Sequence, residues 1–258
     1  MSSEKFIQNN LALTTLICAC LVVLVSLSVR QVFGMFFIDF NDDLGISSTE
    51  FGLAIGIQML GWGLSGPIFG ILADKYFGYR NATVMGALIM ALGHGSMALE
   101  YFSDSFFFLG IALLIIGNGL FKPNISSIVG QLYKDDDIRK DGGYTIFYMG
   151  INAGAFLGIL LCGYLGEKVG WHWGFGLAGI FMFFGMLQFY FAQNIFGEIG
   201  QKPQKKIGDV NANKTSNWPS SVEWDRISVI LVFSAATIFF WWAFEQAGGS
   251  MTIFANDY

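Results

Sequence analysis

Two charged side chains inside long apolar stretches are the residues of this sequence best placed to do chemistry. Lys122 precedes the next basic residue, Lys134, by twelve positions, which is roughly 18 Å at 1.5 Å per helical residue. Glu245 lies nineteen positions beyond Arg226 in another apolar stretch. A charge at the centre of a bilayer costs at least about 2.5–3.5 kcal/mol, so such residues usually face a cavity and act there. The two positions indicate a lysine that binds an anion and a carboxylate that carries a proton.

Other interpretations of these polar residues stay open. A lysine on a shifted helix could reach the membrane surface, and Glu245 could lie near the outer interface if its helix begins late. Arg30 lies shortly before Asp39, where reaching the interface explains its charge as well as a function does. Asn152 could donate a hydrogen bond to a substrate carboxylate, or it could bond across helices.

The composition excludes most other function classes. Of the 258 residues, 54% are hydrophobic and 13% are charged, whereas soluble domains have about 25% charged residues. The net charge of −5 provides no basic surface for nucleic acid. The three cysteines and two histidines lack the spacing of a disulfide framework or a metal site, and no phosphate-binding loop is present. We therefore expect neither an enzyme nor a protein that binds metal or nucleic acid.

Seven apolar stretches, each long enough to cross a bilayer with roughly 20 residues, indicate an all-α membrane protein. They lie at about 11–38, 51–73, 82–99, 106–132, 144–165, 173–195 and 227–254. Transporters built from two six-helix halves have this layout, with a long polar stretch after the sixth helix. We expect a six-helix bundle at 1–196, a cytoplasmic linker at 197–225 and the first helix of a second bundle at 226–258. On this interpretation the chain is a truncated transporter.

The basic residues predict how the chain is oriented. Eleven of the 14 Lys and Arg residues lie before the first stretch or in alternate breaks between stretches, whereas the breaks at 39–50 and 100–105 carry only acidic charges. Positive charge marks cytoplasmic loops. We therefore expect a multi-pass protein of the plasma (inner) membrane, in contact with the lipid bilayer, with a cytoplasmic N-terminus.

The break between the second and third stretches has a mechanical pattern of its own. It contains Asp74, Lys75 and Arg80, and Gly70 lies just before it, near the end of the second stretch. A glycine permits a tight turn, and Asp74 can meet the positive end of a helix dipole while the two bases stay cytoplasmic. Such a turn suits a conformational latch that gates one side of a rocking helix bundle.

Three segments carry long motifs: GNGLFKPNIS at 117–126, YTIFYMGINAGA at 144–155 and WWAFEQAGGS at 241–250. In their order and in the stretches they occupy, they resemble signatures of the proton-dependent oligopeptide transporters (POT), a family of the major facilitator superfamily. The resemblance implies an MFS-type helix bundle with a central cavity. It also implies proton-coupled uptake of di- and tripeptides by alternating access, with the proton as coupling ion and no other cofactor.

The resemblance implies a role for each polar residue by its position. Lys122 would bind the peptide carboxylate or pair with an acid, and Asn152 would bind a peptide terminus. Trp241 and Glu245 would line the substrate cavity from the seventh helix. Glu245 and Lys122 would also take part in proton coupling.

Residues about 30–73 resemble a different branch of the superfamily, one that includes monocarboxylate and oxalate/formate carriers. The first span of POT proteins carries an acidic and tyrosine-rich motif, but Val25 and Ser28 stand where its acids would fall. An organic-anion carrier with Arg30 as the anion partner is therefore an alternative. A non-transporting, half-length membrane scaffold is a third.

Overall fold

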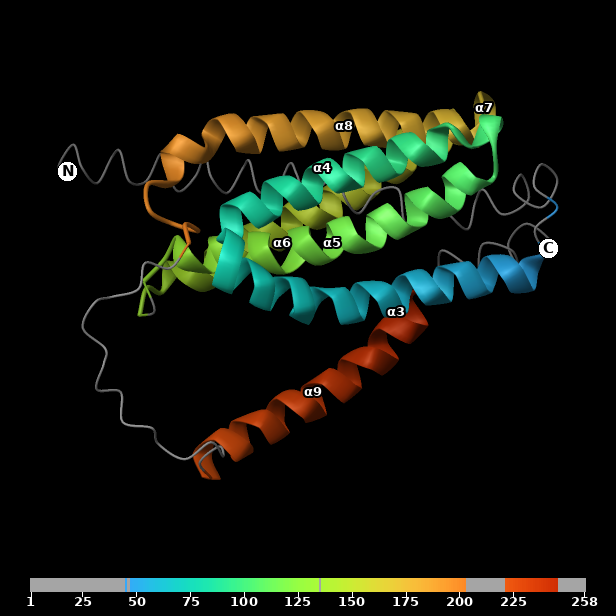
Figure 1. Ribbon diagram of the computed structural model, residues 1–258. Coiled ribbons are helices and arrows are strands. Elements are labelled where there is room, and N and C mark those ends of the chain that lie inside the picture. Colours follow the sequence, from blue (N-terminus) through green and yellow to red (C-terminus); the bar gives the residue numbers. More distant parts are fainter. Residues whose placement is uncertain (1–44, 46, 135, 203–220, 246–258) are drawn as a thin grey trace. The chain divides into compact units, whose positions relative to one another are not determined.

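A computed structural model describes residues 45, 47–134, 136–202 and 221–245 (Figure 1). Within these residues every regular element is helical. The α-helices are α3 (Ser48–Leu72), α4 (Tyr79–Ala98), α5 (Ser105–Gln131), α6 (Arg139–Gly158), α7 (Tyr164–Lys168), α8 (Trp171–Phe191) and α9 (Ser221–Glu245). Short π- and 3-10-helical segments adjoin them: η1 (Ala73–Phe77), η2 (Glu100–Phe102), η3 (Ile159–Gly163) and η4 (Ala192–Phe196).

The chain divides into two compact units, Met1–Pro203 and Gln204–Tyr258. Of the described helices, α9 belongs to the second unit and the others to the first. The division falls inside the predicted linker at 197–225, and the predicted domain limits themselves stay a prediction.

Five helical stretches are long and apolar enough to cross a membrane: Gly52–Phe77, Ser105–Gln131, Arg139–Lys168, Trp171–Phe191 and Ser221–Trp241. The prediction of an all-α membrane protein is thereby confirmed. The predicted first span at 11–38 lies outside the described residues, as does the end of the predicted seventh, after 245. Each of the other predicted spans falls on a described helix.

The helix α4 matches the predicted span at 82–99 but is less apolar than those five stretches. Half of its twenty residues are buried, and most of these are small or polar, including Thr83 and His94. Because so much of α4 faces neighbouring helices, less of its surface has to suit lipid. The lower hydropathy of this span therefore reflects an interior position.

The helix α3 begins at a capping box that the sequence specifies. The Ser47 hydroxyl accepts a hydrogen bond from the Glu50 backbone N–H at 3.3 Å, and the Glu50 carboxylate accepts one from the Ser47 N–H at 2.9 Å. The two bonds satisfy backbone donors that a helix start leaves without partners. The Ser47 hydroxyl, which donates to the Glu50 carboxylate at 2.7 Å, and the Ser47 N–H lower the pKa of the Glu50 carboxyl. An acidic residue in this predicted outer loop therefore has a structural task.

Four helices of the first unit lie side by side in the order α8, α4, α5, α3 (Figure 1). Glycines let α4 and α5 approach closely. A Cβ added at Gly86 would lie 2.7 Å from the Gly117 carbonyl oxygen, and one added at Gly93 would lie 3.1 Å from the Gly110 carbonyl oxygen. Small residues at such contacts are typical of membrane helix pairs. The seven-residue spacing within each helix keeps one antiparallel seam in contact over two turns.

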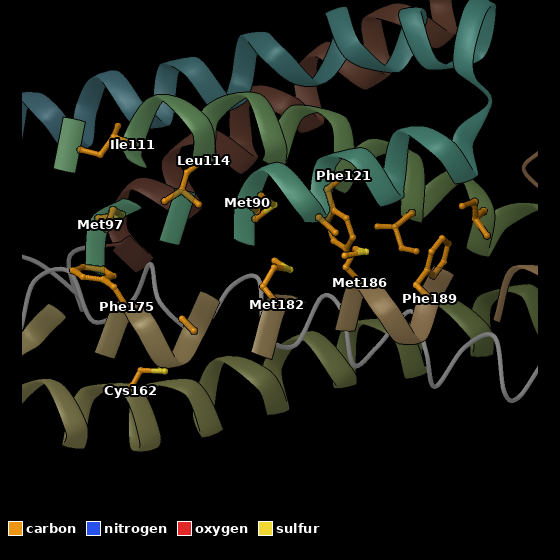
Figure 2. Close-up of a cluster of buried hydrophobic side chains, with 14 of the residues drawn as sticks. Met90, Met97, Ile111, Leu114, Phe121, Cys162, Phe175, Met182, Met186 and Phe189 are labelled. Carbon is orange, nitrogen blue, oxygen red and sulfur yellow. The ribbon is translucent and has the colours of Figure 1, made fainter. Parts of the chain in front are cut away.

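Large side chains fill the space between α8 and the pair α4/α5. Figure 2 shows Phe175, Met182 and Phe189 of α8 directed toward Met97 and Phe121 of the neighbouring helices, and all five are nearly fully buried. Lipid is as apolar as these residues, so their contribution comes from van der Waals packing rather than from leaving water. The packing fixes α4, α5 and α8 relative to one another along their length.

Candidate functional site

A cavity of about 540 Å³ lies between α3 and α5. Side chains and backbone from the two helices line it: Trp62, Gly66, Pro67, Gly70, Ile71, Asn118, Lys122, Pro123 and Ser126. We call it the α3–α5 groove. Its volume is in the range of small-molecule sites, which run from about 300 to 1,000 Å³.

A proline inside each helix faces this groove, Pro67 in α3 and Pro123 in α5. Proline removes a backbone donor, which membrane helices tolerate where side chains satisfy nearby carbonyls. Around Pro123 this is the case: the Asn124 amide donates to the Leu120 carbonyl at 2.6 Å, and the Ser127 hydroxyl donates to the Pro123 carbonyl at 2.9 Å. The motif GNGLFKPNIS thus forms part of one continuous helix, α5, whose groove-facing surface is irregular at the proline.

Three polar side chains stand one above another on the groove face of α5. Asn118, Lys122 and Ser126 recur every four residues, so they share one helix face at steps of about 6 Å. Lys122 is exposed inside the groove. The Ser126 hydroxyl donates to the backbone carbonyl of Lys122 at 3.0 Å. A cation flanked by hydrogen-bonding groups in a mostly apolar cleft is suited to an anionic, partly polar ligand.

The other predicted binding residues lie away from this groove. Asn152 is exposed on α6 and is not among the residues that line the cavity. Trp241 is exposed on α9, and Glu245 is the last residue of that helix. Since α9 belongs to the second unit, the joint site of Lys122 with Trp241 and Glu245 stays a prediction.

The predicted latch residues occupy different environments around the turn between α3 and α4. Gly70 lies inside α3 beside Pro123, and the tight turn is instead made by Gly78, whose φ is +76°. Asp74 accepts a hydrogen bond from the Tyr79 hydroxyl at 2.9 Å, while Lys75 is exposed with its ammonium 5.2 Å from the centre of the Tyr76 ring. The glycine that permits the turn is therefore the one next to α4.

Arg80 is buried and holds the chain that emerges from α8. Its guanidinium donates to the Gln193 carbonyl at 3.1 Å, to the Gly197 carbonyl at 2.5 Å and to the Ile199 carbonyl. The guanidinium carbon also lies 5.4 Å from the centre of the Phe196 ring. A planar guanidinium suits this task because its fixed fork reaches several acceptors at once.

Two backbone contacts complete this arrangement. The Arg80 N–H donates to the Gly200 carbonyl at 3.0 Å, and the Gly200 N–H donates to the Gln131 side chain at 2.8 Å. Gly200 has a φ of +72°, and a Cβ there would lie 3.0 Å from the Arg80 Cγ. We call Arg80, Gln131 and residues 193–200 the Arg80 clamp. It joins the start of α4 and the end of α5 to the segment after α8.

Asn118 was not identified from the sequence as a groove residue, nor Arg80 as a buried one. The two cases differ in whether the sequence contained a signal. Asn118 stands one helical turn before Lys122, so the period of the helix could have identified it. The carbonyl partners of Arg80 lie more than 110 positions away along the chain. No local pattern reports a contact over that distance.

Among the described residues, no group of three His, Cys, Asp or Glu side chains could hold a metal ion. A second cavity, of about 670 Å³, lies beside the Arg80 clamp. Its lining includes Lys134, Lys140 and Glu198. Charges of both signs there give it no preference for one kind of ion.

Comparison with known proteins gives consistent results. The family model described as PTR2, POT family, matches residues 80–220. The peptide transporter YePEPT of Yersinia enterocolitica is 42% identical over 151 residues, which are 58% of this chain and 30% of that protein. A di-/tripeptide transporter of Lactococcus lactis subsp. cremoris is 36% identical over 168 residues, 65% of this chain and 34% of that protein.

Solved structures agree over a wider range. The crystal structure of a peptide transporter POT in complex with sulfate matches with a TM-score of 0.67 and 32% identity, covering 90% of this chain and 45% of that one. The chain thus spans less than half of that protein and matches about a third of the curated relatives. The family match begins at Arg80, so the resemblance of residues 30–73 to another branch stays a prediction. Because the family model matches more than half of the chain, the chain belongs to the POT family of helical membrane transporters.

Proposed function

We propose that this chain forms the N-terminal half of a carrier that takes up di- and tripeptides together with protons by alternating access. The observation that carries the proposal is Lys122, a charged residue within a 27-residue apolar helix that is exposed in the α3–α5 groove. Family membership and the peptide-transporter names of the relatives support it. The protein then acts as a carrier and not as an enzyme.

The groove supplies the substrate side of this function. Lys122 binds the carboxylate of the peptide by a charge-assisted hydrogen bond, which is strong where water is scarce. Apolar neighbours such as Pro67 and Ile71 accept side chains without selecting among them. Asn152 and Trp241 contact other parts of the peptide when the two halves of the carrier close around it.

Proton coupling requires a group that changes its charge during the cycle. Glu245 takes this role, with the proton as coupling ion and no other cofactor. A protonated Glu245 leaves Lys122 to the substrate carboxylate, and an ionised Glu245 competes for the same lysine. Binding of the peptide and binding of the proton are thus linked steps.

The cellular setting follows from the charge pattern. The protein lies in the plasma (inner) membrane with its N-terminus in the cytoplasm, because basic residues gather in alternate breaks. In that orientation the Arg80 clamp lies at the cytoplasmic face. The partners are small peptides, protons and the lipid bilayer, and no nucleic acid.

Uptake of alanyl-alanine under an imposed pH gradient tests the proposal. Cells without peptide carriers of their own would express the gene that encodes this chain. We expect uptake that rises when the outside is acidic, that falls at least tenfold in Lys122→Ala and that loses its dependence on the gradient in Glu245→Gln. Lys168→Ala is the matched control, because it removes an exposed lysine outside the groove.

Three results would overturn the proposal. Uptake of lactate or oxalate without uptake of the dipeptide would favour the organic-anion carrier. Dipeptide uptake that is unchanged in both Lys122→Ala and Glu245→Gln would exclude these residues as the coupling site, and uptake of none of these substrates would favour the non-transporting scaffold.

A further inference from the structure

Asn118 is a largely buried amide for which the described residues supply no hydrogen-bond partner. The residue is 5% exposed and lines the α3–α5 groove, and no hydrogen bond joins its side chain to another residue of the described part of the chain. Leaving a buried polar group without a partner is costly, so native proteins rarely do it. Its neighbour Asn124, which is fully buried, donates from its amide nitrogen to the Leu120 carbonyl. The amide of Asn118 is therefore available to a ligand.

The position of Asn118 relative to Lys122 limits what such a ligand can be. The two residues are four positions apart on the groove face of α5, a distance of about 6 Å along the helix. One extended residue spans at most about 3.3–3.6 Å. A ligand whose carboxylate meets Lys122 thus brings the next one or two residues of a peptide chain alongside Asn118.

The hydrogen-bonding groups of the Asn118 amide further limit which ligands can bind there. Asn118 carries two N–H donors and a carbonyl acceptor, which complement the C=O and N–H of a peptide bond. A lactate or oxalate ion carries no group that would use both and is too short to reach. A site built to pair a polar group discriminates strongly against an analogue that lacks it.

We propose that Asn118 binds the backbone amide of the substrate and is the residue by which the groove selects peptide-like carboxylic acids over simple organic anions. The inference rests on the proposed function, because it places the carboxylate of the same ligand at Lys122. It adds a specificity-determining residue within the first unit. No residue of the second unit is needed for this contact.

The test compares two ligands that differ in the amide alone. Alanyl-alanine and its trans-alkene isostere share their length, carboxylate and amino group, but the isostere lacks the peptide C=O and N–H. Binding of each to the detergent-solubilised 258-residue chain would be measured by equilibrium dialysis. We expect the dipeptide to bind about tenfold tighter, equivalent to about 1.4 kcal/mol. In Asn118→Leu this ratio should fall to about one.

Control variants separate a contact with the ligand from a general disturbance. Asn118→Leu should unfold at no lower temperature than the unmodified chain, because an apolar group replaces an unsatisfied polar one. Asn118→Ala should also lose the ratio and serves if the leucine variant fails to fold. Asn81→Leu, an exposed asparagine at the start of α4, should keep the tenfold ratio.

The outcomes distinguish this inference from the proposed function. A tenfold ratio that survives in Asn118→Leu or Asn118→Ala overturns the inference. Equal binding of the two ligands by the unmodified chain, lost in Lys122→Ala, leaves the function standing and overturns the role of Asn118. Binding of neither ligand overturns the proposed function, and the inference with it.

Discussion

The Arg80 clamp and the α3–α5 groove share one helix, α5, which supplies Gln131 to the clamp and Asn118 to the groove, but the polar groups of the two regions are used in opposite ways. In the clamp, Arg80 donates to three carbonyls and Gln131 accepts from a fourth backbone group. In the groove, Asn118 has no hydrogen-bond partner among the described residues although it is at least as buried as Arg80. The clamp uses its polar groups to join segments of the protein, whereas the groove contains an amide that the described residues leave without a hydrogen bond.

The difference gives a criterion for separating structural from functional polar residues in a membrane protein. Burial alone does not separate them, because both kinds are costly to place away from water. What separates them is whether the protein has already used their hydrogen-bonding capacity. Substitutions in the clamp should therefore lower stability, and substitutions in the groove should change ligand binding.

The largest expected effect is at Arg80. Arg80→Leu removes three hydrogen bonds and leaves their carbonyls dependent on water, so the free energy of unfolding should fall by about 3 kcal/mol. Arg80→Lys should recover less than half of this, because an ammonium lacks the fork that reaches separated acceptors. Thermal and urea unfolding in detergent would measure both. A leucine variant as stable as the unmodified chain would show that the clamp is dispensable.

A smaller loss is expected at Gly200, where the clamp depends on backbone shape. Its φ of +72° strains any other residue, and an alanine Cβ would press on the Arg80 Cγ at 3.0 Å and the Ile128 Cγ1 at 3.1 Å. Gly200→Ala should cost about 1–2 kcal/mol. Gly142→Ala is the matched control: it lies in α6 with open space around it, and it should be neutral or stabilising by up to about 1 kcal/mol.

The groove should show the reverse behaviour. Lys122→Met keeps the length and apolar stem of the side chain, so the loss in the free energy of unfolding should be smaller than in Arg80→Leu. Binding of alanyl-alanine should nevertheless weaken more than tenfold, because the charge-assisted bond is lost. A variant that unfolds much more readily would place Lys122 among the structural residues and break the comparison.

The smallest effect is expected at Asp137, a surface ion pair outside the groove and the clamp. Hydrogen bonds from Arg139, the nearest at 2.8 Å, lower the pKa of the Asp137 carboxyl from 3.8 to about 2. Its contribution is present above about pH 3.8 and is lost as the pH falls through 2. Because the pair is exposed, Asp137→Asn should change the unfolding temperature little at pH 7. Unfolding curves of the unmodified chain and of Asp137→Asn between pH 2 and 6 would show whether their unfolding temperatures differ by more than this.

Periodicity and composition predicted the helices well because both act locally. Apolar stretches of about 20 residues predict spans wherever the bilayer is the solvent, and the described helices fall where they were expected. The helix α4 matches its predicted span but is less apolar than the others. Its polar and small residues are explained by its place between α5 and α8. Lys122 was found because charge is rare in such stretches.

The residues that were missed or misplaced all depend on neighbours distant in sequence. Gly70 was expected at the turn, yet the turn is at Gly78, because α3 and η1 continue as helix to Phe77. Arg80 was expected to be a solvated cytoplasmic charge, and its burial follows from carbonyls that lie beyond α8. Glu245 and Trp241 lie in the second unit, so their roles beside Lys122 stay predictions.

The sequence by itself determined that this is a helical membrane protein with a lysine where the bilayer makes charge expensive. Local hydropathy and the energetic cost of burying a charge are enough for that conclusion. Only the tertiary structure decided which polar groups are already satisfied. Arg80 and Asn118 are both polar residues of apolar helices. Nothing in the sequence around them shows that Arg80 is a structural residue and that Asn118 faces a binding groove. That distinction depends on acceptors supplied by remote segments, which meet these residues only when the helices pack.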